Sequence, residues 1–313
     1  MTSVAVLSRS FSKNIFLKKK ILEKYPSAVF NDTNSILKNK DLINFLKNYE
    51  KAIVALEIID EKILSQLPNL KLISKYGVGL DMIDLHAMSK YNVKLAWTPG
   101  INKRSVSELV IAAAISLMHR SVFANSEVKK NKWYQIRGRQ LSKCTIGIVG
   151  CGNIGKDLVS LLKPYNCKIL VNDIINYDNF YKSNNLIATD LDYLLENSDI
   201  ITLHLPLNGQ TKNIINKKRL ELLKKNSIII NYARGGLIDE KALKECLINK
   251  KIAGAALDVF KTEPPQNNDF YNIDNVLITP HIGGSTEEAI KAMGLSAIDG
   301  LDNAKDPLEF IKY

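Results

Sequence analysis

One stretch, TIGIVGCGNIGKDLVSLLKPYNCKILVND (residues 145–173), constrains the fold more than any other part of the chain. A short apolar run at 145–149 predicts a buried strand, and the leucines that follow at helical spacing predict a helix. Three glycines at the spacing Gly-x-Gly-x-x-Gly lie between them. A second apolar run at 168–171 predicts another strand, and Asp173 follows its end. This order of elements indicates a βαβ unit of a parallel sheet.

Each glycine of this turn has a separate physical task. Gly150 makes the tight turn, Gly152 lets a pyrophosphate approach the backbone, and Gly155 lets the helix pack closely on the strand. The helix that begins near Asn153 then offers free N–H groups and the positive end of its dipole to phosphates. A glycine turn without a ligand would explain the glycines alone, but not the acid downstream. The sequence therefore predicts a dinucleotide site.

Asp173 predicts which dinucleotide binds. A carboxylate at the end of the second strand can accept hydrogen bonds from both hydroxyls of the adenine ribose, whereas it would repel a 2′-phosphate. No arginine follows it closely to offset that repulsion. We therefore expect NAD rather than NADP.

The bulk composition narrows the class of protein. With 313 residues, 46% of them hydrophobic and 24% charged, the chain has room for two ordinary globular domains. The net charge of +11 comes mainly from lysines on predicted helix surfaces, such as Lys18-Lys19-Lys20 in a helix expected at 13–25, so we expect no nucleic-acid partner. The four cysteines form no CxxC pair and no metal-ligand spacing, so we expect no metal and a reducing, cytoplasmic location. We see neither a signal peptide nor an apolar run of about 18 residues, so we expect no membrane span.

Apolar runs alternate with helical patterns along the rest of the chain, which predicts an α/β architecture of parallel sheets covered by helices. A turn signal at Thr98-Pro99-Gly100 ends the first unit, and an almost wholly apolar helix follows at 105–119. The weaker pattern at 121–142 carries Trp133 and Tyr134. It could be a loop packed on its own domain, but we expect an arm that reaches a twin subunit, since aromatic residues concentrate at interfaces.

Arg234, Glu263 and His281 each follow the end of a predicted strand, or the loop just beyond it, where open parallel sheets build their sites. Hydride transfer to or from a hydroxy acid needs a cation for the carboxylate, an acid–base group for the hydroxyl proton, and a carboxylate that orients this group and favours its protonated form. These three residues supply one of each. Taken singly, each could instead be a salt-bridge, turn or packing residue. We interpret the other histidines in that structural way (His86, His119 and His204).

Four motifs carry a resemblance to a known family. VGCGNIG, NYARGGLID, LDVFKTEPP and ITPHIGG occur in this order and together resemble the D-isomer-specific 2-hydroxyacid dehydrogenases. GVGLDMID and TPGINKRSVSELV are most similar to the phosphoglycerate dehydrogenase-like branch, and the resemblance covers nearly the whole chain. It implies two doubly wound parallel-sheet domains. A Rossmann NAD-binding domain (98–284) would be inserted into a discontinuous, flavodoxin-like substrate-binding domain (1–97 and 285–313).

The resemblance also implies roles for individual residues. Arg234, Glu263 and His281 would be catalytic, with His281 the acid–base group and Glu263 its partner. A homodimer would be built on the helix and arm after Gly100. Substrate would be bound by backbone N–H groups of Val78 and Gly79, and by Asn102, Arg234 and His281. The cofactor contacts would be Gly150, Gly152, Asn153, Ile154, Gly155, Asp173, Leu205, Pro206, Tyr232, Ala233, Arg234, Asp258, His281 and Gly283.

Two departures from the branch bear on substrate and regulation. The loop 54–59 carries Glu57 and no cation, where long-form phosphoglycerate dehydrogenases commonly place an arginine for the phosphate. Lys103 and Arg104 could compensate, or they could be surface charges in the first turn of a helix. D-3-phosphoglycerate and an unphosphorylated acid (glycerate, glyoxylate, hydroxypyruvate or a sugar-derived acid) therefore both stay open. Because the sequence ends at Tyr313, we expect no serine-sensing regulatory domain.

Two rival functions share parts of this pattern. An NAD-sensing scaffold, like the co-repressors with this fold, would use the cofactor stretch but has no need of the Arg, Glu and His set. A formate dehydrogenase-like enzyme would have a glutamine where Glu263 stands. We therefore expect an NAD-dependent enzyme that interconverts a D-2-hydroxy acid and its 2-keto acid, with domain closure about hinges near Thr98 and Ser285.

Overall fold

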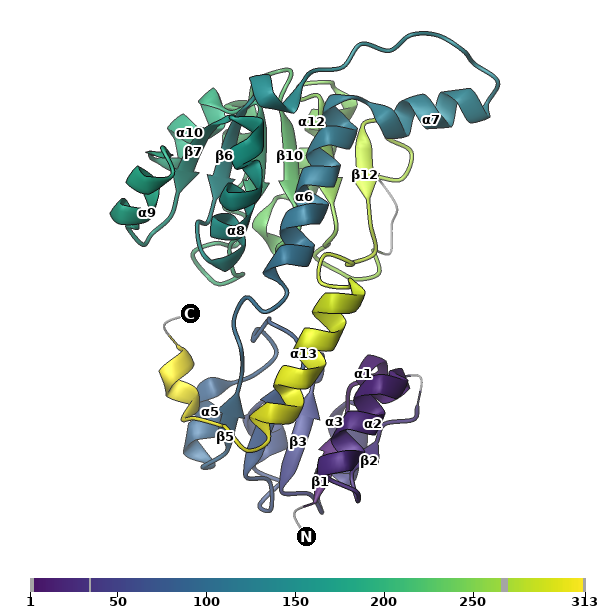
Figure 1. Ribbon diagram of the computed structural model, residues 1–313, viewed down its shortest axis with the longest axis vertical. Coiled ribbons are helices and arrows are strands. Elements are labelled where there is room, and N and C mark those ends of the chain that lie inside the picture. The colour runs from purple at the N-terminus through teal and green to yellow at the C-terminus, as the bar shows by residue number, and fades with distance from the viewer. Residues whose placement is uncertain (1–2, 34, 266–269, 312–313) are drawn as a thin grey trace. The chain divides into compact units, whose positions relative to one another are not determined.

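The structure is a computed structural model that describes residues 3–33, 35–265 and 270–311 (Figure 1). The chain forms two compact units, one of residues 1–102 with 287–313 and the other of residues 103–286. Each unit contains a parallel sheet of its own. The assignment of substrate binding to the first unit and of NAD binding to the whole of the second stays a prediction.

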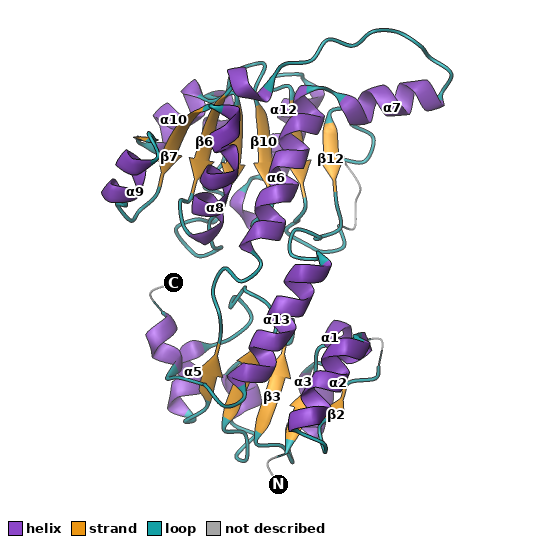
Figure 2. Cartoon of the chain, viewed as in Figure 1, coloured by secondary structure: helices purple, strands orange, loops and turns teal. Residues whose placement is uncertain are grey.

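The first unit is a five-stranded parallel sheet with helices around it (Figure 2). Across the sheet the strands are β2 (Val29–Phe30), β1 (Val4–Val6), β3 (Lys51–Val54), β4 (Leu72–Lys75) and β5 (Lys94–Ala96). The helices are α1 (Arg9–Lys13), α2 (Ile15–Lys24), α3 (Asn39–Leu46), α4 (Glu61–Leu64), α5 (Leu85–Lys90), α13 (Glu287–Gly300) and the 3₁₀ turn η4 (Pro307–Phe310). The order 2-1-3-4-5 is that of flavodoxin-like doubly wound folds, as the family resemblance implies.

Helix α13 completes the first unit although it is distant in sequence. It packs on α2 and β4, and the Ser74 hydroxyl donates a hydrogen bond of 2.7 Å to the Ala297 carbonyl. The helix expected at 13–25 is present as α2, but it begins at Ile15, because extended Asn14 separates it from a further helix, α1, that the sequence does not predict. The Asn14 side chain caps α2 by accepting from the Leu17 N–H at 3.0 Å.

The second unit is a seven-stranded parallel sheet. Across it the strands are β12 (Val276–Ile278), β11 (Gly254–Leu257), β10 (Ile228–Asn231), β9 (Ile200–Leu203), β6 (Thr145–Val149), β7 (Lys168–Asn172) and β8 (Ile187–Ala188). The helices are α6 (Lys103–Met118), α7 (Ser121–Lys129), α8 (Asn153–Leu162), α9 (Asp178–Ser183), α10 (Leu191–Asn197), α11 (Lys217–Glu221) and α12 (Glu240–Ile248). Three 3₁₀ turns complete the unit: η1 (Leu141–Lys143), η2 (Lys163–Tyr165) and η3 (Gly235–Leu237). Strand order reverses between β6 and β9, and such a switch point is where doubly wound sheets bind ligands, at the carboxyl ends of the strands.

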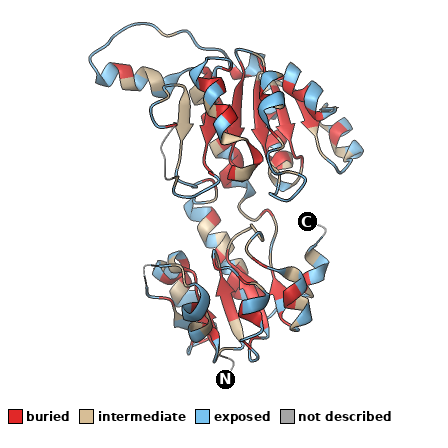
Figure 3. Ribbon diagram, turned by 180° about the vertical axis from the view of Figure 1, so that it is seen from behind, coloured by how far each residue is buried: buried red, intermediate tan, exposed pale blue. Residues whose placement is uncertain are grey.

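The central strands of the second sheet are buried. Strands β9, β10 and β11 are buried along their whole length (Figure 3). Helix α6 packs on α8, which begins in the glycine turn. Trp133 and Tyr134, which follow α7, are 90% and 53% exposed.

Candidate functional site

The glycine turn has the geometry that the sequence predicts. Gly150 has φ +94°, and a Cβ there would lie 2.6 Å from the His204 carbonyl oxygen. A Cβ at Gly155 would overlap the Gly150 carbonyl oxygen, so α8 can pack this closely only without a side chain. A Cβ at Gly152, by contrast, would meet nothing within 4 Å among the described residues. The space above Gly152 is therefore open to a ligand.

Helix α8 begins at this open space. Gly152 is its N-cap and supplies no side-chain hydrogen bond, so the first N–H groups of α8 remain for an anion. Asp173, at the end of β7, accepts from the Cys151 N–H at 2.6 Å through Oδ2 and from the Ile175 N–H at 2.8 Å through Oδ1. A carboxylate has about four acceptor positions, so Asp173 keeps positions for ribose hydroxyls beside the turn. These residues fit a dinucleotide. Burial raises the pKa of the Cys151 thiol to about 11, so this cysteine is not a reactive thiolate.

His281 and Glu263 form a direct pair. The His281 Nδ1 and Glu263 Oε2 atoms are 2.6 Å apart, and Glu263 Oε1 accepts from the Phe260 N–H at 3.0 Å. Because a carboxylate can only accept, Nδ1 carries the proton in this pair. Among the described residues none binds His281 Nε2, and the side chain is 50% exposed. The pair can therefore work as an oriented acid–base group whose Nε2 faces a reactant.

The backbone around His281 is unusual. His281 has φ +55°, a left-handed conformation that side chains with a Cβ rarely adopt. Asp258, which is 2% exposed, accepts from the Thr279 hydroxyl at 2.6 Å and from the Ile282 and Gly283 N–H groups, both at 2.7 Å. In this structure the Asp258 carboxylate is thus turned toward the His281 turn. Its implied contact with the cofactor stays a prediction.

Arg234 lies at the carboxyl end of β10. Buried Asn231 shapes its loop by donating to the Arg234 carbonyl at 2.8 Å and accepting from the Ala233 N–H at 3.2 Å. A Cβ at Gly235 would overlap the backbone of Phe260. The loop that carries Arg234 therefore packs directly on the segment that holds Glu263.

The other implied cofactor residues lie at this same carboxyl edge of the second sheet. They are Asn153 and Ile154 at the start of α8, Leu205 and Pro206 after β9, Tyr232 and Ala233 after β10, and Gly283 after β12. His204, also after β9, does not belong to the acid–base group, because burial lowers its pKa to about 3 and Nε2 lies 3.0 Å from the Thr202 hydroxyl. The structural interpretation of His204 fits these facts.

The implied substrate residues of the first unit are Val78, Gly79 and Asn102. Within the described chain, the backbone N–H groups of Val78 and Gly79 donate to no other residue, and the Val78 carbonyl accepts from the Trp97 indole at 2.9 Å. Asn102 Oδ1 is buried and has no partner among the described residues. These groups remain for a ligand. Their place relative to Arg234 and His281, which belong to the second unit, stays a prediction.

The acidic residue of the loop 54–59 is buried, which the sequence does not show. Glu57 is 2% exposed, and its Oε2 accepts from the Ala55 N–H at 2.7 Å. Lys75, to which the sequence assigns no role, is 5% exposed and donates to the Ala55 carbonyl. Its position at the end of apolar strand β4, just before the Gly77–Gly79 loop, was the available signal. A buried carboxylate and a buried ammonium thus hold opposite ends of the Ala55 backbone.

Arg104 already has a partner. Its guanidinium binds Asp157 of α8 through two hydrogen bonds of 2.9 and 3.0 Å, and the Asp157 side chain is 7% exposed. Lys103 is exposed. Of the two cations that the sequence offered for a phosphate, one is therefore committed to the second unit's own helix.

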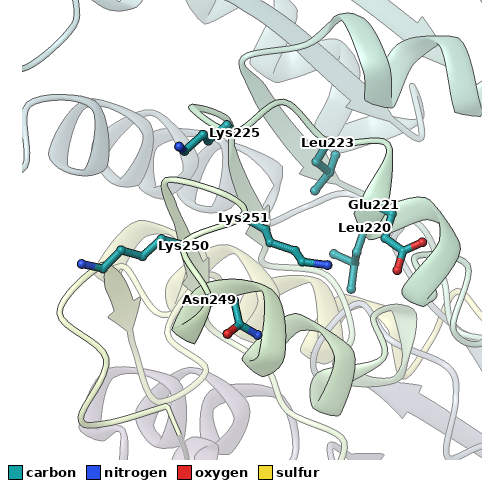
Figure 4. Close-up of a pocket in the computed structure, with 7 residues that line it drawn as sticks. All are labelled: Leu220, Glu221, Leu223, Lys225, Asn249, Lys250 and Lys251. Atoms are coloured by element: carbon teal, nitrogen blue, oxygen red, sulfur yellow. The ribbon is translucent and has the colours of Figure 1, made fainter.

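A basic depression lies elsewhere on the second unit (Figure 4). Its lining residues come from the end of α11 and from the loops before β10 and β11, at the edge opposite the glycine turn: Leu220, Glu221, Leu223, Lys225, Asn249, Lys250 and Lys251. None of the predicted site residues lines it.

Among the described residues, no group of three or more His, Cys, Asp or Glu side chains could hold a metal ion, and no single helix is long and apolar enough to cross a membrane. Helices α6 and α7 reach that length and composition only as a pair bent by 61°.

Comparison with known proteins agrees with this geometry. The sequence profile described as "D-isomer specific 2-hydroxyacid dehydrogenase, NAD binding domain" matches residues 111–283. A glyoxylate reductase of Thermofilum pendens is 39% identical over 243 residues, which are 75% of this chain and 72% of that protein. A D-3-phosphoglycerate dehydrogenase of Methanocaldococcus jannaschii is 38% identical over 75% of this chain and 46% of its own length. The crystal structure of Aquifex aeolicus D-lactate dehydrogenase with NAD and lactic acid superposes with a TM-score of 0.85 at 28% identity, over 99% of this chain and 98% of that one.

Proposed function

The chain belongs to the D-isomer specific 2-hydroxyacid dehydrogenase family, and we propose on that basis which residues and which substrate it uses. As a member it is an NAD-dependent oxidoreductase that interconverts a 2-hydroxy acid and its 2-keto acid. We infer that its substrate is a small unphosphorylated acid, such as glyoxylate or hydroxypyruvate in the reductive direction. The observation that carries this choice is the pairing of Arg104 with Asp157.

We assign the proton chemistry to His281. Bound NAD supplies the hydride acceptor in oxidation, and its reduced form supplies the donor. His281 Nε2 takes the hydroxyl proton in oxidation and returns it in reduction, while Glu263 holds the Nδ1 proton and stabilises the imidazolium that forms. Arg234 offers a guanidinium to the substrate carboxylate, and the N–H groups of Val78 and Gly79 offer further donors.

The charge arrangement disfavours a phosphorylated acid. A phosphate needs a cation that is not already neutralised. The Arg104 guanidinium donates one hydrogen bond to each oxygen of the Asp157 carboxylate. Glu57 is 2% exposed, so its carboxylate is not accessible to the hydroxyls of a larger sugar-derived acid. Both observations favour a short substrate. Relatives named glyoxylate reductase and D-3-phosphoglycerate dehydrogenase keep both substrate classes within the family.

The test compares kcat/KM for hydroxypyruvate with that for its 3-phosphate ester, both with NADH. The unphosphorylated acid should be preferred, and Lys103→Ala/Arg104→Ala should leave the ratio of the two values unchanged. Lys75→Met, which removes a buried cation of the first unit, is the variant for comparison. It should also leave the ratio of the two kcat/KM values unchanged. A preference for the ester in the unmodified enzyme would overturn the substrate assignment without touching the reaction type.

We also propose that the arm after α6 builds a homodimer in the cytoplasm. Trp133 and Tyr134 are exposed, while Glu127 holds the arm through hydrogen bonds from Lys130 at 3.2 Å and the Tyr134 hydroxyl at 2.9 Å, and an ion pair with Lys132 at 3.1 Å. An arm that makes internal hydrogen bonds yet exposes aromatic rings fits an interface. Light scattering should give a dimer, and Trp133→Ser should yield a monomer, whereas Ser in place of Tyr193, a 47% exposed ring on α10, should not. The four free cysteines suit a reducing compartment.

A further inference from the structure

The first turn of α6 contains a buried serine that touches the histidine turn. Ser105 is 6% exposed, and its hydroxyl donates a hydrogen bond of 2.6 Å to the Gly283 carbonyl, 178 residues away in sequence. Gly283 is two residues beyond His281 and is itself buried. Neither the family resemblance nor the geometry of the His281–Glu263 pair assigns a role to Ser105.

The histidine turn needs to be held from outside. A left-handed residue other than glycine costs about 1–3 kcal/mol and persists only where its surroundings determine it. Asp258 fixes the N–H groups of Ile282 and Gly283, but it cannot fix the Gly283 carbonyl, which belongs to the next peptide. Glycine leaves that next peptide free to rotate. Among the hydrogen bonds of the described residues, the one from Ser105 sets its orientation.

Helix α6 is a fixed support for this bond. Its residue Arg104 is paired with Asp157 of α8, and the Ser107 hydroxyl is 3.4 Å from the Ile154 carbonyl. The Val106 side chain lies 3.6 Å from the place a Cβ would take on Gly283. The start of α6 therefore contacts both the cofactor helix and the histidine turn.

We propose that Ser105 is a positioning residue that holds the His281 turn so that the imidazole meets Glu263. The proposal rests on the proposed catalytic role of His281, but its geometric part concerns the free protein alone. Asp258 holds the N–H groups of the turn and Ser105 holds its carbonyl. Loss of the Ser105 hydroxyl would leave the Gly283 carbonyl buried without a donor, and the turn would rotate to find one.

The test uses Ser105→Ala, with Ser105→Thr as the variant that restores a hydroxyl. Ser107→Ala is the matched control, because it removes an equally buried hydroxyl from the same helix without touching the turn. The first measurement is proton NMR of the N–H that His281 and Glu263 share, a strongly downfield signal assigned by its loss in His281→Ala. The second is kcat for a 2-keto acid, compared with the dissociation constant of NADH from fluorescence.

Ser105→Ala should shift or broaden the shared-proton signal and lower kcat by about 10- to 100-fold, as expected for a misplacement of up to about 1 Å. NADH binding should change less than about threefold, Ser105→Thr should recover the signal, and Ser107→Ala should keep it. An unchanged signal in folded Ser105→Ala would overturn the proposal whatever happens to kcat. If Ser105→Ala does not fold, Ser105→Gly, which also lacks a donor, is measured instead, and an unchanged signal there overturns the proposal equally. If no keto acid is turned over by any form, the proposed function fails, yet the NMR result still decides the geometry.

Discussion

Substitution by alanine at two glycines of one turn should change two different properties, cofactor binding at one and stability at the other. Gly152→Ala should weaken NADH binding and leave the fold intact, whereas Gly155→Ala should destabilise the second unit. The reason is the space that each methyl group would enter. At Gly152 the new Cβ meets no described atom within 4 Å, but at Gly155 it meets the Gly150 carbonyl oxygen.

The magnitudes follow from those contacts. A methyl group at Gly152 occupies the approach to the free N–H groups of α8, and a hydrogen bond between such a group and a phosphate is worth about 1.5–3 kcal/mol. The dissociation constant of NADH should therefore rise by about 10- to 200-fold. Gly152 has φ −76°, which alanine adopts, and alanine is a weaker N-cap than glycine, so the free energy of unfolding should fall by no more than about 1 kcal/mol.

Gly155→Ala forces a methyl group against backbone. Overpacking of this kind costs about 1–3 kcal/mol, because α8 has to move away from the turn. For a domain of this size, each kcal/mol lowers the Tm by about 2–4 °C. The expected fall is therefore about 2–12 °C.

The assay measures both quantities for both variants. Fluorescence titration gives the dissociation constant of NADH, and thermal unfolding followed by circular dichroism gives the Tm. Gly209→Ala is a control, since it also meets nothing within 4 Å but lies away from the turn. If Gly152→Ala bound NADH as tightly as the unmodified protein, the pyrophosphate would not pass over this glycine and the reasoning would be refuted.

Three further predictions concern single carboxylates. Asp173→Ala should lower the ratio of kcat/KM with NADH to kcat/KM with NADPH. Equal kcat/KM values for the two cofactors in the unmodified enzyme would rule out a role of Asp173 in cofactor choice. Glu263→Gln should lower kcat by about 10- to 200-fold with NADH binding unchanged, because a charge-assisted hydrogen bond is worth about 1.5–3 kcal/mol; an unaltered kcat would contradict the pairing. Hydrogen bonds from Lys132, Tyr134 and Lys130 lower the pKa of Glu127 to about 2, from an ordinary 4.5. A lowered pKa stabilises only above the ordinary value, so the protection factors of the arm's amides, which are exchange rates corrected for the intrinsic pH dependence, should be constant from neutral pH to about pH 5 and fall as the pH falls toward 2. Glu127→Gln should show low protection factors at every pH, and protection equal to that of the unmodified protein would exclude this role.

The features that the sequence predicts well are local ones. The glycine turn, its strand and its helix depend on residues within one βαβ unit, so spacing alone identifies them, and the predicted fold class is confirmed. The separation of α1 from α2 is not apparent from the sequence, because Lys13 and Ile15 both suit a helix, and only the hydrogen bond that the Asn14 cap accepts from Leu17 shows that two helices meet there.

The features that the sequence leaves open depend on packing between distant segments. Arg104 and Asp157 are 53 residues apart, and only the packing of α6 on α8 pairs them. Glu57 looks like an exposed loop acid, but the turn after β3 directs it back to Ala55. The type of a residue does not show whether its charge faces solvent, a ligand or its own backbone. Whether the substrate carries a phosphate depends on which of these Glu57 and Arg104 face.

The most direct test of the account is the effect of His281→Ala on two quantities measured on one preparation. They are kcat for the reduction of glyoxylate or hydroxypyruvate, followed through the absorbance of NADH, and the dissociation constant of NADH. The account predicts a fall of kcat by about 10²–10⁴-fold with nearly unchanged NADH binding, because His281 supplies the proton and not the cofactor site. Retention of full activity in folded His281→Ala would contradict the account, since the reaction would then take its proton from another group.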